Sequence, residues 1–448
     1  MKKKYNLNIN YKIKPFRYKL NEVDRDKSIS IRSFIIASIS EGVSIINNPL
    51  KSEDVNSCIN ALRKLNVKIK KIQKEKYLVY GKSLGSLYAN RNTTLDFGNS
   101  GTAMRLLTGV LATTPGLQVI LKGDPSLTKR NMKKIFDLCE LFGATFIPTK
   151  KYYLPVKMIS SSIPLAINYN PGVSAQLKSA AILGGSNAFG ETIIQDEQLS
   201  RDHTENMLNN VNAVKILKKN KSRIIRVIGK KTFKAQKYEI PVDPSSAAFF
   251  VVLTILSNNS KLTINNVCLN NRRIGYLKIL KKAGARIKFA NTKKINNEVI
   301  GSIIVRSSKL KPLKVNKKFY PITADEYPIL FVAASFINGI SSFDGVDDLI
   351  NKESNRIKEM QNILKQINIF FKYKKNKVVI KGKKNIITNN KQIIVKDLGD
   401  HRICMSASIL GLLTGIPTKI KNFATVNTSA PSFLKIIKKI GGHFAIKK

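Results

Sequence analysis

The sequence predicts an α/β fold made of six copies of a small helix–strand unit. At six places a helical segment ends at Asn or Gly and a strand-like stretch follows at once. The ending residues are Asn66, Gly143, Asn212, Gly284, Asn368 and Gly441. Asn and Gly tolerate the left-handed backbone that closes a helix. Their separations of 69 to 84 residues are too long for a solenoid repeat.

Helices are expected where apolar residues recur at helical spacing after a turn that exposes backbone N–H groups. These segments are residues 26–40, 101–113, 129–142, 173–184, 203–211, 244–256, 325–337, 352–367, 402–414 and 430–440. Ile- and Val-rich stretches between them are expected strands, for example 223–228, 302–306 and 377–381. Helix–Gly–strand turns also occur singly in α/β proteins. Their near-even spacing here favours repetition, with three copies per domain and a crossover at residues 241–244.

Length and composition place the chain among globular proteins. Its 448 residues allow two or three domains with sizeable cores. No apolar run approaches the ~20 residues of a membrane helix, and the start, MKKKYNLNINYKIK, lacks the apolar stretch of a signal peptide. We therefore expect a cytoplasmic protein without membrane contact. The four cysteines form no CxxC pair and the three histidines are widely separated, so neither a disulfide framework nor a metal site is expected.

The charge is unusual, with 78 basic against 28 acidic residues and a net charge of +50. Such a balance is compatible with nucleic-acid or anion binding. It is also compatible with compositional drift towards Lys, Asn and Ile. The lysines are dispersed, there is no Trp, and aromatic residues do not alternate with Arg as base stacking would require. We therefore expect no specific nucleic-acid partner, although a basic surface attracts small anionic substrates.

The segment DKSISIR places three anion-binding groups at the start of a helix. Asp24 or Asp26 is a candidate cap, and the N–H groups of a first helical turn attract anions. Lys27, Ser28 and Arg32 offer an ammonium, a hydroxyl and a guanidinium to one phosphate or carboxylate. A capped surface helix explains the segment equally well.

Two further turns have a similar character. In DFGNSGTAMR, Gly98 and Gly101 flank two polar residues ahead of a helix, which exposes backbone N–H groups to an anion. The motif is neither a Walker loop nor GxGxxG. An ordinary turn between a strand and a helix would have a similar sequence. In GDPSLTKR, Arg130 lies at the expected start of a helix, where most arginines are solvated.

The segment NPGVSAQLKSA puts Ser174, Gln176 and Lys178 at the front of an Ala-rich helix, and SRDHTE follows the next strand. Small polar groups of this kind suit a polyhydroxylated ligand. Helix capping is the competing explanation.

Carboxylates precede two helices in the second half of the chain. ADEYP places Asp325 and Glu326 ahead of an apolar helix, as candidates for proton transfer or as ordinary first-turn acids. In LGDHR, Asp400 is expected to cap the next helix, from whose first turn Arg402 then points.

The segment INKESNR places Lys352 and Arg356 four residues apart, on one face of the expected helix, with Glu353 beside them. Like charges at this spacing repel unless an anion lies between them, although a solvated face is the plain alternative. Cations at loop-to-helix junctions thus recur along the chain, at Lys27, Arg32, Arg130, Lys352, Arg356 and Arg402. In a two-domain repeat protein such junctions can converge on a cleft that binds a pair of anionic substrates.

The motifs DKSISIR, GNSGTAMR, SAQLKSA, SRDHTE, DEYP, KESNR and DHR occur in the order found in one family. Over roughly residues 10–445 the chain resembles the 5-enolpyruvylshikimate-3-phosphate synthases, or 3-phosphoshikimate 1-carboxyvinyltransferases. The resemblance implies two domains, each of three βαβαββ units (the inverse α/β barrel of the enolpyruvyl transferases). The domains would be residues 1–24 with 244–448, and residues 25–243, with the active site in the cleft between them.

The implied reaction transfers the enolpyruvyl group of phosphoenolpyruvate to the 5-hydroxyl of shikimate 3-phosphate and releases phosphate. It belongs to the shikimate pathway, which leads to chorismate and the aromatic amino acids, and implies no metal or organic cofactor and a monomer. By position, the catalytic residues would be Asp325, Glu353 and Lys27. Shikimate 3-phosphate would be bound by Lys27, Ser28, Arg32, Ser174, Ala175, Gln176, Arg201, Asp325 and Lys352. Phosphoenolpyruvate would be bound by Lys27, Gly101, Arg130, Gln176, Arg356 and Arg402.

The chain departs from the family pattern at a few positions, among them Ile31, where His is usual, and Asn355, where Asp is usual. The nearest alternative is the sister enolpyruvyl transferase that acts on UDP-N-acetylglucosamine. That enzyme has Lys-Asn where this chain has Lys27-Ser28, and a reactive Cys in a loop that corresponds to residues 113–126, where this chain has none.

Overall fold

The six predicted helix-ending turns are present in the structure. The backbone angle φ is 62° at Asn66, 91° at Gly143, 53° at Asn212, 101° at Gly284, 58° at Asn368 and 89° at Gly441. Each turn joins a helix to a strand. These angles lie in the left-handed region that Gly and Asn tolerate. The predicted α/β fold with six repeated copies is confirmed.

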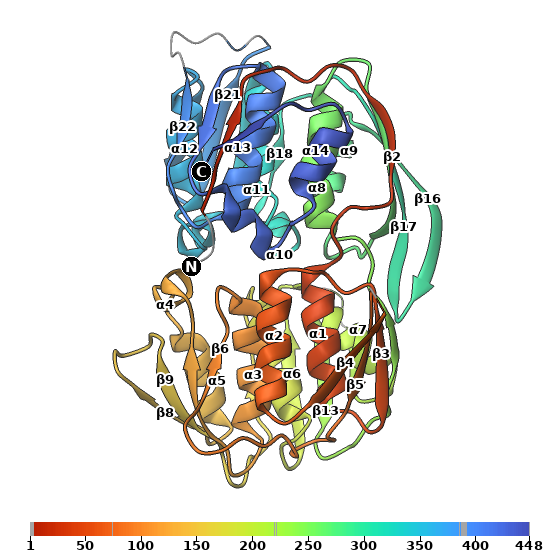
Figure 1. The fold of residues 1–448 in the computed structure, drawn as a ribbon, viewed down its shortest axis with the longest axis vertical. Helices are drawn as coiled ribbons and strands as arrows, with labels where there is room; N and C mark the ends of the chain where they lie inside the picture. The colour runs from red at the N-terminus through yellow and green to blue at the C-terminus, as the bar shows by residue number, and fades with distance from the viewer. Residues whose placement is uncertain are drawn as a thin grey trace. The chain divides into compact units, whose positions relative to one another are not determined.

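The computed structural model describes residues 4–73, 75–218, 220, 222–384, 386 and 392–447. The chain divides into two compact units (Figure 1). The inserted unit is Arg25–Pro241 with Lys294–Glu298, and the terminal unit is Met1–Asp24, Val242–Lys293 and Val299–Lys448. The ends of the expected terminal domain, residues 1–3 and 448, lie outside the described residues. The predicted domain bounds stay a prediction. So does the predicted active site in the cleft between the two domains.

The inserted unit contains seven helices and twelve strands within its described residues. In chain order they are α1 (Lys27–Ser38), β3 (Val43–Asn47), α2 (Glu53–Lys64), β4 (Lys68–Gln73), β5 (Lys76–Tyr80), β6 (Thr93–Asp96), α3 (Gly101–Ala112), β7 (Gln118–Lys122), α4 (Pro125–Thr128), α5 (Lys133–Leu141), β8 (Thr145–Pro148), β9 (Val156–Ile159), β10 (Asn168–Tyr169), α6 (Ala175–Gly185), β11 (Glu191–Asp196), α7 (His203–Asn209), β12 (Lys215–Lys218), β13 (Arg223–Ile228) and β14 (Lys237–Glu239).

The terminal unit begins and ends the chain. Its elements are β1 (Asn6–Ile9), β2 (Arg17–Leu20), α8 (Pro244–Leu256), β15 (Lys261–Cys268), α9 (Gly275–Lys282), β16 (Arg286–Ile295), β17 (Glu298–Arg306), β18 (Lys314–Val315), α10 (Tyr320–Thr323), α11 (Tyr327–Ser335), β19 (Gly339–Asp344), α12 (Arg356–Lys365), β20 (Phe370–Lys374), β21 (Lys377–Gly382), β22 (Ile393–Val395), α13 (His401–Thr414), β23 (Thr418–Ile420), α14 (Phe433–Lys439) and β24 (Ala445–Lys447). Short 3₁₀ helices lie at Lys317–Phe319, Asp347–Asn351 and Phe423–Thr428. The tip of the β16–β17 hairpin, residues 294–298, groups with the inserted unit. There Glu298 Oε1 lies 2.8 Å from His203 Nδ1.

The strands of the described residues form six four-stranded sheets with one common topology. In β6-β7-β9-β8, for example, β6 is parallel to β7, and β9 is antiparallel to both β7 and β8. The elements of this copy follow the order βαβαββ, if the short α4 is counted with α5. The other sheets are β14-β3-β5-β4, β10-β11-β13-β12, β16-β17-β15-β2, β18-β19-β21-β20 and β22-β23-β1-β24.

Three sheets are completed by strands from distant parts of the chain. β14, at the end of the inserted unit, pairs with β3 near its beginning. β2 pairs with β15, although residues 25–241 of the inserted unit separate them in the sequence. β1 lies between β23 and β24, so the first and last strands of the terminal unit are neighbours in one sheet.

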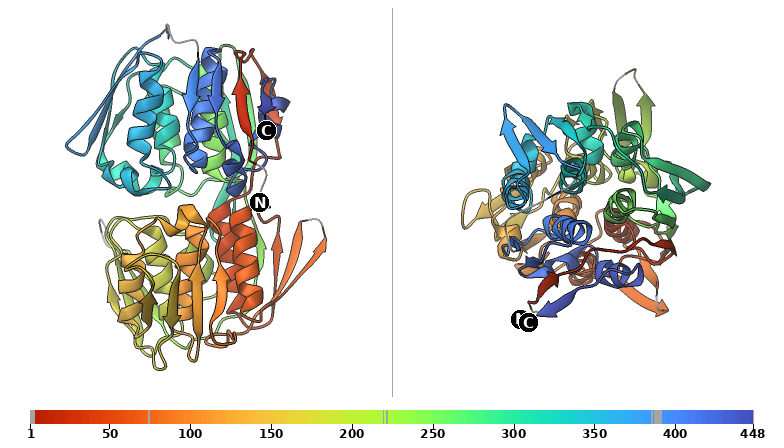
Figure 2. Two further views of the ribbon diagram at one scale, coloured as in Figure 1. Left: turned by 60° about the vertical axis from the view of Figure 1, so that its left-hand side comes forward. Right: turned by 90° about the horizontal axis from the view of Figure 1, so that it is seen from above.

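Among the described residues, each unit has three helices that are almost completely buried: α1, α3 and α6 in the inserted unit, and α8, α11 and α13 in the terminal unit. They pack against one another inside the sheets (Figures 1 and 2). α3 and α6 approach closely because Gly109 has no side chain; a Cβ there would lie 2.5 Å from the carbonyl oxygen of Ala180. The remaining long helices have one buried and one exposed face, as a covering helix requires.

Several predicted helix boundaries are wrong, including the start expected at 430, which lies at Phe433. The helix expected at 129–142 begins at Lys133, because Asp124 and Pro125 start a separate short helix, α4. The helix expected at 352–367 begins at Arg356, because Asn355 caps it through a 3.0 Å bond to the N–H of Lys358. The helix expected at 325–337 begins at Tyr327, with Pro328 in its first turn. None of the helices in the described part of the chain combines the length and apolar character needed to cross a bilayer.

Asp24 is a buried acid whose ionisation opposes folding. Burial raises its pKa to about 7, although its carboxylate accepts the N–H of Ser432 at 3.1 and 3.2 Å. The unfolded chain ionises this group near pH 4, whereas the folded chain keeps it protonated up to about pH 7. The folded state is therefore progressively penalised as the pH rises from 4 to 7, and the penalty persists above 7.

We expect Asp24→Asn to stabilise the protein at pH 8 by roughly 2–4 kcal/mol and to have little effect at pH 4, because an amide keeps an acceptor without ionising. Thermal unfolding of both proteins from pH 4 to 8 tests this. The exposed Asp344→Asn variant is the control. A variant whose unfolding midpoint falls with pH as steeply as that of the parent chain would contradict the assignment.

Candidate active site

Predicted site residues of the inserted unit meet at the first turns of α3 and α6. Arg105 Nη1 donates to Gln176 Oε1 at 3.0 Å, and Gln176 Nε2 donates to Thr102 Oγ1 at 3.0 Å. A Cβ on Gly101 would lie 2.8 Å from Arg105 Nη1 and 3.0 Å from Arg130 Nη1. The structure therefore brings Gly101, Arg130 and Gln176 together around Arg105, and we call these four residues the Arg105 cluster. Two guanidinium groups beside a helix N-terminus form a site suited to an anion.

Lys27 is the first residue of α1, whose cap is Asp26, with a 2.8 Å bond to the N–H of Ile29. The Lys27 ammonium lies 2.8 Å from Asp54 Oδ2 on α2, and both side chains are largely buried. Of the two candidate caps, Asp26 is the one used. Ser28 follows Lys27 on the same helix, and its carbonyl oxygen accepts from Arg32 Nη1 at 3.1 Å.

Arg32 lies one turn deeper in α1 and is 3 % exposed. Its Nε donates to Thr204 Oγ1 and its Nη2 to Ser179 Oγ, both at 2.9 Å. Arg32 thus links α1 to α6 and α7.

Ser174 caps α6 by accepting the N–H of Leu177 at 3.2 Å, and Ala175 is the first residue of that helix. Arg201 lies in the segment between β11 and α7. Lys178, which the sequence placed among the candidate ligands at the front of α6, is completely buried and paired with Asp196 and Glu205. It cannot contact a ligand.

The predicted residues of the terminal unit gather around Arg356, the first residue of α12. Arg356 Nε lies 2.9 Å from Asp400 Oδ2, its Nη1 lies 3.6 Å from Asp325 Oδ1, and its Nη2 contacts Glu353 at 2.5 Å. Arg402 Nη2 lies 3.5 Å from Asp325 Oδ2. We call Asp325, Glu353, Arg356, Asp400 and Arg402 the Arg356 cluster.

The electrostatics of the Arg356 cluster keep its central group charged. Burial opposes the charge of Arg356, but Asp400, Glu353 and Asp325 together hold its pKa well above the ordinary value. Asp400 also caps α13 by accepting the N–H of Arg402 at 2.9 Å, as predicted. A partly exposed carboxylate, Asp325, therefore lies between two fixed guanidinium groups. This arrangement can bind an anion and transfer a proton beside it.

Lys352 occupies a different position from the one predicted. It ends a 3₁₀ helix with an extended backbone, at φ −88° and ψ −156°, so it shares no helix face with Arg356. Its ammonium contacts Asp348 and lies 5.9 Å from the centre of the Tyr320 ring.

Three partners of the predicted residues were not predicted from the sequence. Arg105 stands four residues after Gly101, a spacing that puts both on one helix face, so the motif itself contained the signal. Asp54 and Asp400 are 27 and 44 residues away from Lys27 and Arg356. No local pattern indicates such pairs.

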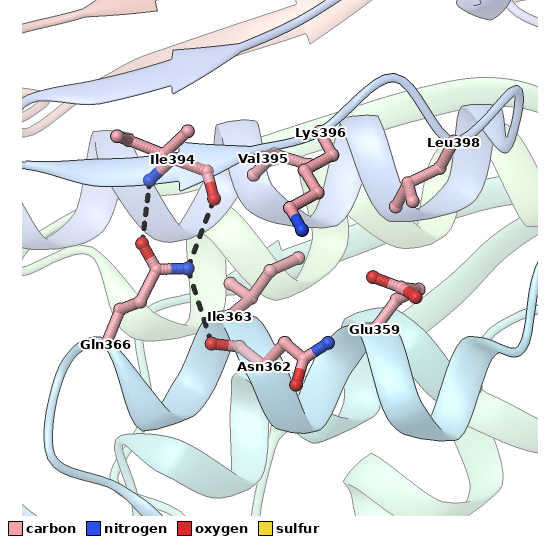
Figure 3. A pocket seen from close by; sticks show the side chains of 8 residues that line it. All are labelled: Glu359, Asn362, Ile363, Gln366, Ile394, Val395, Lys396 and Leu398. Atoms are coloured by element: carbon pink, nitrogen blue, oxygen red, sulfur yellow. Dashed lines mark hydrogen bonds between the residues drawn. The ribbon is translucent and has the colours of Figure 1, made fainter.

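A pocket of about 280 Å³ lies elsewhere in the terminal unit, between α12 and β22 (Figure 3). Gln366 spans one end of it, accepting the N–H of Ile394 at 2.8 Å and donating to its carbonyl oxygen at 3.1 Å. Glu359 and Lys396 line the pocket with mainly aliphatic neighbours. No predicted site residue lines it, so it is distinct from the candidate site.

Residues 12–437 match the family described as EPSP synthase (3-phosphoshikimate 1-carboxyvinyltransferase). This chain belongs to the EPSP synthase family. A relative named 3-phosphoshikimate 1-carboxyvinyltransferase, from Petrotoga mobilis, is 38% identical over 417 residues, which cover 93% of this chain and 95% of the relative. One from Caldicellulosiruptor saccharolyticus is 38% identical over 418 residues, with 93% and 95% covered.

Solved structures agree with the family assignment. An EPSP synthase from Acinetobacter baumannii has a TM-score of 0.85 and 31% identity, with 99% of this chain and 100% of that chain covered. The enolpyruvyl transferase NikO from Streptomyces tendae has a TM-score of 0.76 at 11% identity, with 99% of each chain covered. This second likeness shows the fold alone. The predicted fold class, the six-copy architecture of the enolpyruvyl transferases, is confirmed.

Proposed function

We propose that this chain transfers the enolpyruvyl group of phosphoenolpyruvate to the 5-hydroxyl of shikimate 3-phosphate and releases phosphate. It would act as a 3-phosphoshikimate 1-carboxyvinyltransferase in the shikimate pathway to chorismate and the aromatic amino acids. Family membership over residues 12–437 supports the reaction class. The assignment of residues rests mainly on the Asp325 carboxylate, whose oxygens lie 3.6 Å from Arg356 Nη1 and 3.5 Å from Arg402 Nη2.

The anionic groups of the two substrates suit the cations of the two clusters. For phosphoenolpyruvate we propose Gly101, Arg130 and Gln176 from the Arg105 cluster, Arg356 and Arg402 from the Arg356 cluster, and Lys27. For shikimate 3-phosphate we propose Lys27, Ser28, Arg32, Ser174, Ala175, Gln176, Arg201, Asp325 and Lys352. Each of the two sets of substrate-binding residues includes residues of both units. We therefore propose that the two clusters act on one pair of substrates.

In the addition step, Asp325 accepts the proton of the 5-hydroxyl while that oxygen bonds to C2 of phosphoenolpyruvate. The methylene carbon C3 takes a proton delivered by Glu353 together with Lys27, which gives a tetrahedral ketal. In the elimination step, Glu353 with Lys27 takes a proton back from C3, the double bond re-forms, and the bond from C2 to the phosphate oxygen breaks. The arginines stabilise the departing phosphate. Arg356 holds Glu353 and lies near Asp325, so one guanidinium orients both proton-transfer groups.

A phosphate-release assay with phosphoenolpyruvate and one acceptor at a time tests the proposal. We expect release with shikimate 3-phosphate and none with UDP-N-acetylglucosamine. Release only with the sugar nucleotide would overturn the choice of acceptor. A monomeric state, which the resemblance implies, and a cytoplasmic location, which the sequence analysis favours, stay predictions.

Gly101 offers a second test. In Gly101→Ala the new methyl group would displace Arg105 Nη1 and Arg130 Nη1, which are the ends of flexible side chains. We therefore expect an almost unchanged thermal midpoint and a rise of roughly tenfold in KM for phosphoenolpyruvate, since about 1.4 kcal/mol of lost binding is a tenfold change. An unchanged KM would remove the Arg105 cluster from the phosphoenolpyruvate site.

A further inference from the structure

Five charged side chains lie inside the inserted unit and have no part in the proposed reaction. We call Lys178, Asp196, Asp202, Glu205 and Arg223 the Lys178 cluster. The side chains of Lys178, Asp196 and Glu205 have no exposed surface, and those of Arg223 and Asp202 are 9% and 12% exposed. Buried ion pairs contribute little net stability, and a well-attested use of buried polar groups is to specify one arrangement of the chain.

Lys178 uses all three of its N–H donors. Its Nζ lies 2.8 Å from Glu205 Oε1 and 3.0 Å from Asp196 Oδ2, and it donates to the carbonyl oxygen of Ser200 at 3.1 Å. One ammonium on α6 therefore ties together the end of β11, the segment that follows it, and α7. Burial raises the pKa of Asp196, but Lys178 and Arg223 outweigh it and hold that pKa below its ordinary value.

Arg201 is flanked on both sides by residues that the cluster holds. The N–H of Ser200 donates to Asp196 Oδ1 at 3.2 Å, so both backbone polar groups of Ser200 bind the cluster. On the other side, Asp202 Oδ2 lies 3.3 Å from Arg223 Nη1, while Arg223 Nη2 lies 2.7 Å from Asp196 Oδ2. The backbone that carries Arg201 is thus fixed before and after it.

The same cluster borders the contacts of Arg32. Ser179 follows Lys178 on α6, and Thr204 precedes Glu205 on α7. Thr204 Oγ1 donates to Ser179 Oγ at 2.8 Å, and both hydroxyls accept from Arg32. Arg32 is held directly by these two hydroxyls, and none of these bonds involves a charged group of the Lys178 cluster.

We infer that Lys178 is a positioning residue for shikimate 3-phosphate, which acts by fixing the backbone that carries Arg201. This inference rests on the proposed function. The side chains of the Arg105 cluster are held by Thr102 and Asn99, outside the Lys178 cluster. Loss of the Lys178 cluster therefore raises KM for shikimate 3-phosphate and leaves KM for phosphoenolpyruvate nearly unchanged.

The experiment compares Lys178→Met, Lys178→Met/Glu205→Gln, Arg201→Ala and the triple variant, with both KM values and the thermal midpoint measured for each. Lys178→Met leaves three carboxylates facing one arginine, and the added Glu205→Gln restores the original charge balance. We expect the double variant to recover most of the thermal midpoint but to keep a KM for shikimate 3-phosphate raised roughly tenfold. The triple variant should be no worse than Arg201→Ala alone, since residues that act through one group are not additive.

Three results would overturn the inference: an equal rise in both KM values, a return of KM to normal when the thermal midpoint recovers, or multiplied effects in the triple variant. If the double variant does not fold, Asp202→Ala carries the same expectation, because it removes the acceptor of Arg223 on the other side of Arg201. Lys134→Met, at an exposed position of α5, is the control for loss of a lysine. A parent chain that is inactive with shikimate 3-phosphate would instead refute the proposed function.

Discussion

Replacing Asp325 with alanine or asparagine is expected to lower kcat by about three powers of ten, within the range for a general acid–base group. The fold should be retained, since the Asp325 side chain is 23% exposed. KM for phosphoenolpyruvate should not rise, because Arg356 and Arg402 lose a carboxylate that competes with the substrate for them. Steady-state kinetics of both variants, with the thermal midpoint as a check of folding, provide the measurement.

Asp137→Asn is a suitable control, because Asp137 is an exposed acid that pairs only with the exposed Lys133 among the contacts described here. Its kcat should equal that of the parent chain. Near-normal turnover of Asp325→Asn would remove this carboxylate from the proton transfer. A large rise in KM with unchanged kcat would make it a binding group instead.

Lys27→Met is expected to lower kcat/KM by roughly a thousandfold and to raise KM for phosphoenolpyruvate. The ammonium would be lost both as a binding cation and as a partner in proton delivery. The variant also leaves Asp54, 6% exposed, without the cation 2.8 Å away. Breaking a buried pair in this way costs about 3 kcal/mol of stability.

The double variant Lys27→Met/Asp54→Asn separates these two effects. It removes the buried carboxylate together with its cation, so stability should recover while kcat/KM stays low. Recovery of activity along with stability would mean that Lys27 only supports the fold. An unchanged KM for phosphoenolpyruvate in Lys27→Met would contradict its double role.

Local chemistry explains why the repeated architecture could be predicted from the sequence. The left-handed turn at each helix end requires Gly or Asn, so Asn66 and Gly143 mark their positions without reference to tertiary structure. Caps are equally local, and Asp400 was predicted for this reason. The correct start of α12 also had a local signal, because Asn355 is a favoured cap residue. The expected start at Lys352 lies three residues before that cap.

The contacts that define the candidate site are not local. Arg356 acquires its role by meeting Asp325, which precedes α11 in the same copy of the repeat, and Asp400, which precedes α13 in the next copy. Lys178 is a residue that tertiary structure removes from the site. A lysine at the front of a helix is a reasonable candidate for ligand binding, but Asp196 of β11 and Glu205 of α7 bury and pair this one. Sequence reasoning identifies which residues stand at helix starts. Only the packing of the copies decides which of them face a substrate.

The position of β1 between β23 and β24 has a consequence for the order of events during synthesis. β1 leaves the ribosome long before β23 and β24, so its sheet cannot form until both are made, and β2 likewise cannot pair until β15 is made. All but five residues of the inserted unit emerge in between as one continuous segment. It can acquire its own core while the terminal unit is still incomplete, so the unit whose first two strands are made before the inserted unit is completed after it.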